Sequence, residues 1–335
     1  MSLRVESPGL LSTLQALGRA GYQHLGVGPG GALDEVSHRL ANLLVGNPPG
    51  APTLEITLVG PRLRFEQDSL MALGGADLSA TLDGQPLPLW RPVLVRTGTC
   101  LAFGKPRLGA RSYLAVEGGF EAPSLLGSAS THLGAGFGGF QGRALRAGDR
   151  LRFGPAPSIS YPRLRQRFAQ ERGPCLAPDW FAPWFRELDF GRPALLGLVP
   201  GPQGTDLTPA SRTALLEGEF PVSPDSNRMG IRLQGPALAL ERPREMISSG
   251  VATGTLQLPP DGHPILLLAD RQTTGGYPRL GEVATVDLPK AAQLRPGESL
   301  RFASLSLEEA QARLRQRETR LQELEAILAD RRDHG

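Results

Sequence analysis

Apolar and polar residues alternate along several short stretches of the chain. The clearest are Val93 to Phe103, Arg111 to Val116, and two stretches that end at Phe153 and Phe302. Alternation with a period of two is typical of a strand with one buried face, and glycine or proline interrupts it roughly every ten residues. The pattern predicts a mostly β fold built from barrels or sandwiches.

One stretch near the N-terminus has helical spacing instead. Apolar residues recur at helical intervals from Leu33 to Leu44, Asp34 is placed to act as the N-cap, and Gly46 stands near the end. These are start and stop signals of a helix. We expect helix over this stretch.

The C-terminal stretch also predicts a helix, with one apolar seam. Ser306 and Glu309 form a capping box. The leucines of the seam recur every seven residues, with Leu324 on the adjoining stripe: Leu307, Leu314, Leu321 and Leu328. We expect one continuous helix over 306–330. The seam fits a short coiled coil with another helix, including self-association, and it equally fits packing against the neighbouring β unit.

The chain contains two stretches that match each other at a constant offset. LEITLVGPRL, from Leu54, aligns with MGIRLQGPAL, from Met229, so that Gly60-Pro61 falls on Gly235-Pro236. Gly75 then falls on Gly250, and each half closes with a similar strand pattern, ALRAGDRLRF and QLRPGESLRF. We infer two related halves, and the alternative is that both stretches are generic hairpins.

The repeat predicts the domain organisation. We expect a first β domain at 1–154, a linker at 155–192, a second β domain at 193–303 and the C-terminal helix at 304–335. The linker is rich in proline and arginine, and its aromatic residues suggest that it packs down: Trp180, Phe181, Trp184 and Phe185.

Composition agrees with a globular protein of two domains. The chain has 335 residues, of which 40% are hydrophobic and 21% charged. Lys105 and Lys290 are its lysines, so arginine carries nearly all the positive charge, and the net charge of +3 is too small and too dispersed to favour nucleic acid.

The expected compartment is the cytoplasm. Cys100 and Cys175 are too few for a disulfide scaffold and suggest free thiols. The N-terminus lacks the apolar core of a signal peptide, and the longest aliphatic run, Ile265 to Ala269, is too short to span a bilayer.

Several familiar site motifs are absent or unconvincing. The five histidines are scattered without metal-ligand spacing, so we expect no metal, and we expect no covalently bound cofactor. Two G-x-G-x-x-G matches occur, but neither has the strand and helix context of a dinucleotide site, and no G-K-[ST] follows. The first match still offers a candidate anion or cofactor site at Gly28, Gly31 and Asp34, with a plain tight turn as the alternative.

Two polar loops in the second half form the better candidate site. They run from Ser226 to Gly230 and from Asp270 to Pro278. Arginine forks suit a carboxylate or phosphate, and glutamine and threonine suit an amide. The candidate substrate-binding residues are Asn227, Arg228, Arg271, Gln272, Thr273, Thr274 and Tyr277. The alternative for each is a structural turn, no catalytic residue is assigned, and we expect both loops at one end of the second β unit.

The sequence resembles the allophanate hydrolase subunit 2 family, also called biotin-dependent carboxyltransferase-like or KipA-like, from about Leu10 to Phe302. The resemblance rests on GLLSTLQALGRAGYQHLGVGPGGALDEVSHRLANLLVGNP, GSASTHLGAGFGGFQGRALRAGD, SNRMGIRLQG and DRQTTGGYP. It implies cyclophilin-like β-barrels, so that the second β domain is expected to be cyclophilin-like, and a partner of the subunit 1 family.

The resemblance implies an activity as well. Members of this length are most similar to the C-type subunit of 5-oxoprolinase. This implies a complex with an A-type and a B-type subunit that binds ATP and opens 5-oxoproline to glutamate. The alternatives are a urea-type biotin-dependent carboxyltransferase component and a non-catalytic, kinase-regulating protein that acts with its subunit 1 partner.

This sequence departs from the family pattern at three positions. Ala16 stands where an acidic residue is common, and Ala129 and His132 replace the more usual arginine and tyrosine. Substrate choice is expected to differ if these positions contact ligand.

Overall fold

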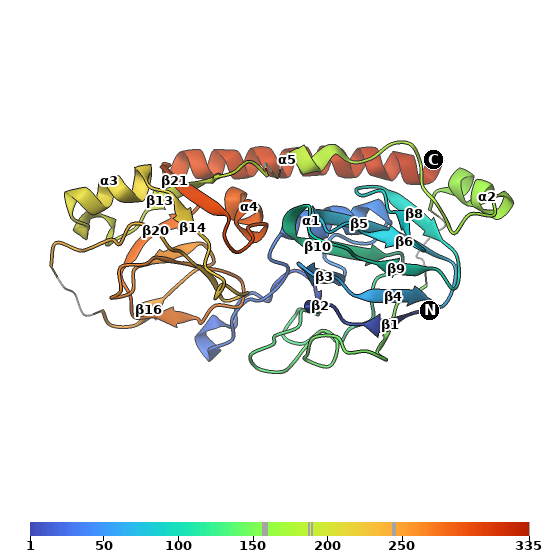
Figure 1. Cartoon of the computed structure of the whole chain (residues 1–335), viewed down its shortest axis with the longest axis horizontal. Helices are drawn as coiled ribbons and strands as arrows, with labels where there is room; N and C mark the ends of the chain where they lie inside the picture. Colours follow the sequence, from blue (N-terminus) through green and yellow to red (C-terminus); the bar gives the residue numbers. More distant parts are fainter. Residues whose placement is uncertain (156–159, 187, 189, 243–245, 335) are drawn as a thin grey trace. The chain divides into compact units, whose positions relative to one another are not determined.

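The computed structural model describes residues 1–155, 160–186, 188, 190–242 and 246–334. The chain divides into two compact units, and each is assembled from separate stretches of sequence (Figure 1). The first unit comprises residues 1–18, 34–188 and 321–335. The second comprises residues 19–33 and 189–320.

Two six-stranded sheets enclose the core of the first unit. Sheet A has the order β11-β1-β4-β9-β6-β7. Its strands are β1 (Ser2–Ser7), β4 (Arg62–Phe65), β6 (Thr81–Leu82), β7 (Gln85–Pro86), β9 (Cys100–Ala102) and β11 (Arg150–Arg152). Sheet B has the order β12-β8-β5-β10-β3-β2. Its strands are β2 (Leu11–Gln15), β3 (Thr53–Thr57), β5 (Ser69–Asp77), β8 (Pro92–Val95), β10 (Leu108–Val116) and β12 (Cys175–Leu176).

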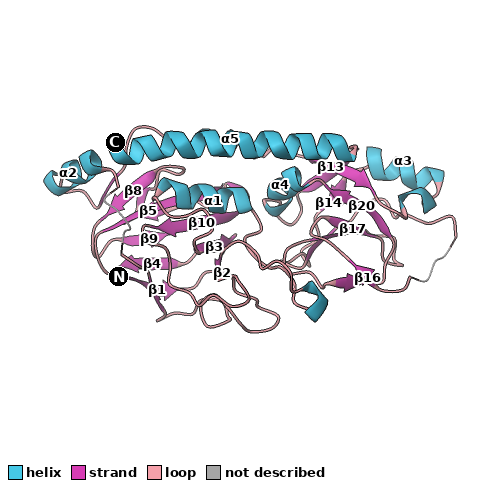
Figure 2. Ribbon diagram, turned by 180° about the vertical axis from the view of Figure 1, so that it is seen from behind, coloured by secondary structure: helices cyan, strands magenta, loops and turns pink. Residues whose placement is uncertain are grey.

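Helix α1 (Glu35–Leu44) covers the face of sheet B that points away from this core. The side chain of Asp34 accepts a hydrogen bond from the backbone N–H of Ser37, which confirms the predicted N-cap. Because sheet B is covered on both faces, β5 and β10 are buried almost throughout. Figure 2 shows α1 lying along these strands.

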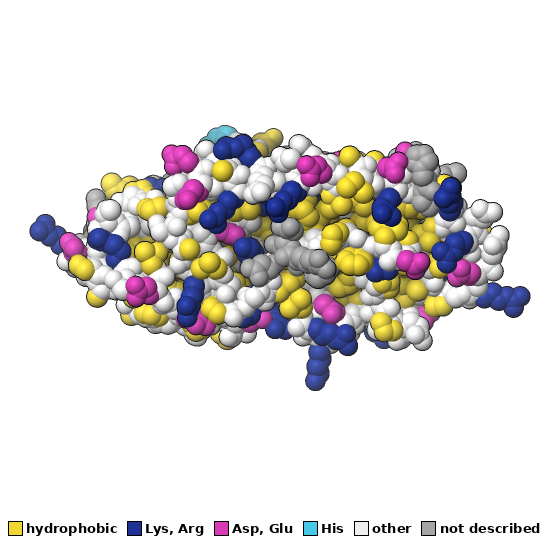
Figure 3. All heavy atoms as spheres, turned by 90° about the horizontal axis from the view of Figure 1, so that it is seen from above, with side chains coloured by type: hydrophobic (Ala, Val, Ile, Leu, Met, Phe, Trp, Pro, Cys, Tyr) yellow, Lys and Arg dark blue, Asp and Glu magenta, His cyan; other side chains and the backbone are white. Residues whose placement is uncertain are grey.

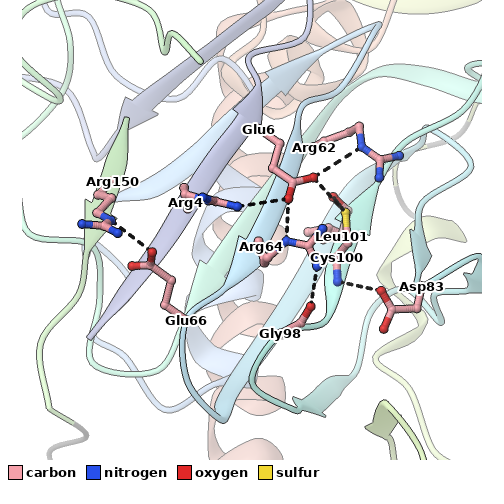
Figure 4. Close-up of polar contacts among 10 residues, drawn as sticks. All are labelled: Arg4, Glu6, Arg62, Arg64, Glu66, Asp83, Gly98, Cys100, Leu101 and Arg150. Atoms are coloured by element: carbon pink, nitrogen blue, oxygen red, sulfur yellow. Dashed lines mark hydrogen bonds and ion pairs between the residues drawn. The ribbon is translucent and has the colours of Figure 1, made fainter. Parts of the chain in front are cut away.

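The outward face of sheet A carries charges. Arg4, Arg62 and Arg64, on the neighbouring strands β1 and β4, surround the carboxylate of Glu6 (Figure 4). The bond from Arg64 lowers the pKa of Glu6. Alternate residues of β1, such as Leu3 and Val5, point inward to the core. This is the alternation of an antiparallel sheet with one wet face.

The predicted linker contains structure of its own. Its described part forms α2 (Pro162–Gln170), β12 and the 3₁₀ turn η2 (Pro183–Arg186), and β12 pairs with β8. Trp184 is buried and Phe181 is exposed, while residues 156–159, 187 and 189 and the side chain of Phe185 lie outside the described part.

The second unit is built on one curled seven-stranded sheet, of order β14-β21-β13-β20-β17-β18-β15. Its strands are β13 (Ala194–Pro200), β14 (Phe220–Pro221), β15 (Gly230–Arg232), β17 (Thr255–Gln257), β18 (Ile265–Leu267), β20 (Arg279–Val283) and β21 (Ser299–Ser304). A short ribbon pairs β16 (Ser249–Gly250) with β19 (Thr274–Gly275). The helical segments are η1 (Gln23–Leu25), η3 (Gly204–Asp206), α3 (Pro209–Glu217), η4 (Thr285–Asp287) and α4 (Leu288–Ala292).

Helix α5 (Leu307–His334) confirms the predicted C-terminal helix. The capping box forms, because Ser306 and Glu309 exchange the two expected hydrogen bonds. Leu321 and Leu328 are buried, but Leu307 is 55% exposed, so the predicted seam is wrong at its first position. Leu305, two residues earlier, is buried instead.

The predicted fold class is confirmed: the described part of the chain is mostly β, with curled sheets and a long C-terminal helix (Figure 2). The stretches matched in the sequence form β3 and β15, and then β11 and β21. Their pairing differs, since β11 pairs antiparallel with β1 whereas β21 pairs parallel with β13. Superposition of the two halves stays a prediction. Cys100 and Cys175 are free thiols, as predicted.

Arginine is spread over the surface. Figure 3 shows the dark-blue side chains interspersed with acidic and apolar ones on the face in view. No described helix is both long and apolar enough to cross a membrane.

Two leucines of α5 provide a matched test of the buried seam. Leu328→Ala removes a buried side chain, and we expect the free energy of unfolding to fall by about 2 to 5 kcal/mol. Leu307→Ala changes an exposed side chain, and we expect a change within about 0.5 kcal/mol. Urea unfolding of both variants measures the difference, and equal losses would show that the seam is not buried at Leu328.

His38 predicts how stability depends on pH. The ring is fully buried on α1 beside Thr53 and Tyr113, and burial lowers its pKa from 6.5 to about 4. The unfolded chain therefore binds a proton below pH 6.5 that the folded chain does not bind until about pH 4. The contribution of neutral His38 to the free energy of unfolding is fully present above pH 6.5. It falls by up to about 1.4 kcal/mol per pH unit as the pH drops from 6.5 to about 4.

The measurement is urea unfolding at several pH values between 7 and 4 for the wild type and for His38→Gln. We expect the free energy of unfolding of the variant to decline less steeply with falling pH, with a difference of about 3 kcal/mol over the window. Parallel curves would show that His38 does not titrate in this way.

Candidate functional site

The two predicted polar loops lie side by side at one edge of the second unit. The backbone N–H of Asp270 donates to the carbonyl of Arg228, and the N–H of Leu268 donates to the carbonyl of Met229. The loops precede β15 and follow β18, which are neighbouring antiparallel strands. The expectation that both loops approach one end of the second β unit is confirmed.

A cavity of about 490 Å³ opens beside these loops. Its polar lining comes from Asn227, Arg232, Gln257, Arg271, Gln272, Thr274 and Tyr277, and its apolar lining includes Met229, Ile265 and Leu267. We call it the polar pocket. It contains five of the seven predicted substrate-binding residues, and Arg228 and Thr273 lie outside its lining.

Arg271 is the buried charge of the polar pocket. Its side chain is 4% exposed, its Nε donates to the carbonyl of Val251 at 3.2 Å, and its Nη1 donates to Oγ1 of Thr253 at 2.7 Å. These two bonds hold the guanidinium in one orientation and leave Nη2 for a ligand. Burial lowers the pKa of Arg271, opposed by the nearby carboxylate of Glu282. A desolvated guanidinium is a strong partner for a carboxylate.

Glu282 lies close behind the pocket. Both of its carboxylate oxygens are 2.9 Å from the hydroxyl of Thr255. Burial raises the pKa of Glu282 above its usual value, while the Thr255 hydrogen bond and the charges of Arg279 and Arg271 oppose the shift. Glu282 thus partly balances the positive charge of Arg271.

Arg228 has a different environment from the one predicted. It is 4% exposed and forms a fork with the carboxylate of Asp270, with distances of 2.8 Å from Nε and 3.0 Å from Nη2. Its Nη2 also donates to the carbonyl of Gly31 at 2.7 Å. These contacts give Arg228 a structural role in joining the loops.

The first glycine-rich motif belongs to the same unit. The N–H of Gly30 donates to the carbonyl of Ala269, next to the ion pair. Gly30 and Gly31 have φ of 60° and 95°, which favour glycine. A Cβ on Gly30 would lie 3.0 Å from Nη1 of Arg19, a buried arginine. Of the three candidate cofactor residues, Gly31 therefore supports the loops, Gly28 is buried, and the carboxylate of Asp34 is occupied in capping α1 of the first unit.

A buried polar face in the first unit was not predicted. On the side of sheet B away from the core, Tyr113 donates to Glu55 at 2.9 Å and accepts from the N–H of Asp34. Gln15 is fully buried and donates to Thr13. The one available signal was the alternation in TLEIT, whose polar positions face α1 instead of solvent.

The three positions that depart from the family pattern lie in adjoining loops of the first unit. The N–H of Ala16 donates to Oγ of Ser130, which neighbours Ala129. The ring of His132 stacks on Phe137 with centroids 5.1 Å apart. The departures thus cluster in space.

A second, larger cavity of about 730 Å³ adjoins the polar pocket through Gly276 and Tyr277. Leucine, proline and Met246 dominate its lining, and no charged side chain contributes to it among the described residues. It is therefore poorly suited to an anion. No cluster of three or more possible metal ligands occurs in the described part of the chain.

The chain belongs to the family of carboxyltransferase domains, subdomain A and B, whose model matches residues 25–304. Among its relatives is the C-type subunit of 5-oxoprolinase from Escherichia coli, 38% identical over 308 residues, with 92% of this chain and 93% of the relative covered. The protein of the same name from Haemophilus influenzae is 34% identical, with 96% of each chain covered.

A solved structure gives the same family likeness. The urea amidolyase of K. lactis matches with a TM-score of 0.81 and 32% identity over 92% of this chain. This chain spans 19% of that much longer protein. The likeness supports the fold of this chain and does not extend to the activity of the whole longer protein.

The ion pair between Arg228 and Asp270 can be tested by unfolding. Arg228→Met leaves the carboxylate of Asp270 buried without its charge partner, and we expect a loss of about 3 to 5 kcal/mol in the free energy of unfolding. The double variant Arg228→Met, Asp270→Leu removes both charges of the pair and should recover part of that loss, since buried Arg19 also loses the carboxylate of Asp270 as a neighbour. Arg301→Met, at an exposed pair with Glu219, is the control and should cost less than about 1 kcal/mol. An unchanged single variant would contradict the structural role.

Proposed function

We propose that this chain is the C-type subunit of an ATP-dependent 5-oxoprolinase complex, which hydrolyses 5-oxoproline to glutamate. The observation that carries the proposal is the share of each protein's length that takes part in the match. The two bacterial 5-oxoprolinase relatives match this chain nearly from end to end in both directions. The yeast urea amidolyase relative also matches 93% of this chain, but only 17% of its own length takes part.

The polar pocket has the chemistry that this substrate requires. 5-Oxoproline carries one carboxylate and one ring amide. Arg271 offers a desolvated cation for the carboxylate, and Gln257, Gln272 and Thr274 offer donors and acceptors for the amide. We place substrate binding in this pocket, with Asn227 and Tyr277 at its rim.

The proposal requires partners. Opening an unactivated lactam is slow, and phosphorylation of the amide oxygen by ATP makes it feasible when cationic and N–H groups stabilise the developing charge. The chain lacks a P-loop sequence, so we assign ATP binding to the complex. The other members of the complex are an A-type subunit and a B-type subunit, the latter from the subunit 1 family. We place the complex in the cytoplasm, and this chain alone is inactive.

A second candidate is a component of a biotin-dependent carboxyltransferase. The K. lactis structure, with its TM-score of 0.81, and the family description favour it. Such a component would need a biotinylated partner. The test is an assay with this chain, a biotinylated protein and urea. Carboxyl transfer to urea, together with no hydrolysis of 5-oxoproline, would favour the carboxyltransferase role. The kinase-regulating role stays a prediction.

Arg271 tests the proposed site. In the reconstituted complex, Arg271→Ala should lower kcat/KM for ATP-dependent 5-oxoproline hydrolysis at least about tenfold, since a charge-assisted contact in a desolvated site is worth about 1.5 to 3 kcal/mol. Arg301→Ala, at an exposed surface pair, should leave turnover unchanged.

The measurement combines steady-state kinetics with circular dichroism, which checks that Arg271→Ala stays folded. Arg271→Lys keeps the positive charge but loses the two-pronged guanidinium. Its kcat/KM should lie between those of the wild type and Arg271→Ala. Wild-type turnover in Arg271→Ala would remove substrate binding from this pocket. Full activity of the isolated chain would contradict the requirement for partners.

A further inference from the structure

Gln257 has an unusual position in the polar pocket. It ends strand β17, lines the cavity and is only 5% exposed. Its Nε2 is buried and has no hydrogen-bond partner within the described residues. A buried donor without a partner costs about 1 to 3 kcal/mol, and native proteins rarely leave one.

The neighbours of Gln257 do not satisfy this carboxamide. The hydroxyl of Thr255, two residues earlier on the same strand, bonds to both oxygens of Glu282. Arg271 uses Nε and Nη1 on Val251 and Thr253. None of these hydrogen bonds involves the carboxamide of Gln257, and the pocket that it lines is a source of a partner.

Gly275 keeps space for the Gln257 side chain. A Cβ on Gly275 would lie 2.3 Å from Nε2 of Gln257 and 3.2 Å from its Oε1. The backbone at Gly275 does not have a positive φ, so the requirement for glycine is one of room and not of conformation. The carboxamide of Gln257 thus lies against Gly275, and both residues line the polar pocket.

A primary carboxamide presents a donor and an acceptor side by side. Its complement is an amide whose N–H and C=O lie on the same side. Ring amides have this cis arrangement, whereas ordinary open-chain amides are trans and point the two groups in opposite directions. A glutamine and a ring amide can therefore form two parallel hydrogen bonds.

We propose that Gln257 is the specificity-determining residue of the polar pocket, which recognises the cis N–H and C=O of a cyclic amide while Arg271 binds the carboxylate of the same ligand. The ligand class is thus a lactam or cyclic urea that carries a carboxylate. This inference rests on the proposed function for the assignment of 5-oxoproline as the ligand. Gly275 is a positioning residue, because it acts through Gln257.

Three small ligands separate the two hydrogen bonds. 5-Oxoproline has both groups of the ring amide, 5-oxotetrahydrofuran-2-carboxylate has a ring oxygen in place of the N–H, and cyclopentanecarboxylate lacks both groups. With the assembled complex, calorimetry should show 5-oxoproline binding at least about tenfold more tightly than either analogue, since a buried hydrogen bond contributes about 1.4 kcal/mol or more. In Gln257→Leu the affinities for 5-oxoproline and for the two analogues should differ by no more than about twofold. Gln234→Leu, on the exposed surface, should keep the wild-type preference.

Glycine substitutions give a second test that leaves Gln257 in place. Gly275→Ala places a methyl group against the carboxamide, and the preference for 5-oxoproline over cyclopentanecarboxylate should fall as in Gln257→Leu. Gly250→Ala, on the paired strand β16, meets nothing within 4 Å and should keep the wild-type preference. This pair decides the matter if Gln257→Leu fails to fold.

The outcomes distinguish this inference from the proposed function. If the complex hydrolyses 5-oxoproline but Gln257→Leu and Gly275→Ala keep the full ligand preference and KM, the inference is wrong and the proposed function stands. Such a result would mean that Gln257 binds a water molecule or is only structural.

If the complex does not hydrolyse 5-oxoproline, the proposed function fails. The inference is then decided by measuring how the cyclic urea 2-oxoimidazolidine-4-carboxylate binds to the wild type and to Gln257→Leu. Equal binding to both proteins, or binding to neither, would overturn it.

Discussion

The buried ion pair between Arg228 and Asp270 fixes the geometry on which the polar pocket depends. Charges leave water only when they are paired and hydrogen-bonded, so neither residue can move away alone. The pair joins three segments that are distant in sequence, because Arg228 also bonds to the carbonyl of Gly31. Asn227 and Arg271, each next to one member of the pair, are thereby held in the lining of the pocket.

The two loop arginines illustrate how surroundings divide one residue type between two roles. The carboxylate of Asp270 and a backbone carbonyl occupy the fork of Arg228, so its charge is compensated within the fold. Arg271 is equally buried, but its bonds go to a neutral carbonyl and a hydroxyl, and Glu282 compensates its charge only in part. Uncompensated charge in a desolvated cavity favours an anionic ligand.

Local signals in the sequence were sufficient for the elements that depend on local chemistry. The cap at Asp34 and the capping box at Ser306 marked two helices, and alternation marked the long strand β10. The sequence could not separate Arg228 from Arg271, because the partners of both come from distant residues. Gln257 was missed because it ends an ordinary strand, and its importance depends on the glycine opposite and on the absence of a partner among the described residues.

The division of the chain has a consequence for the order in which the protein folds during synthesis. The first unit needs residues 321–335, which are made after every residue of the second unit, and the second needs residues 19–33, which are made before most of the first. The first unit therefore stays incomplete until the whole of the second has been made. Contacts between such distant segments form slowly and leave apolar surface open in the meantime. The surface that Leu321 and Leu328 cover thus stays exposed to water until the end of α5 has been made.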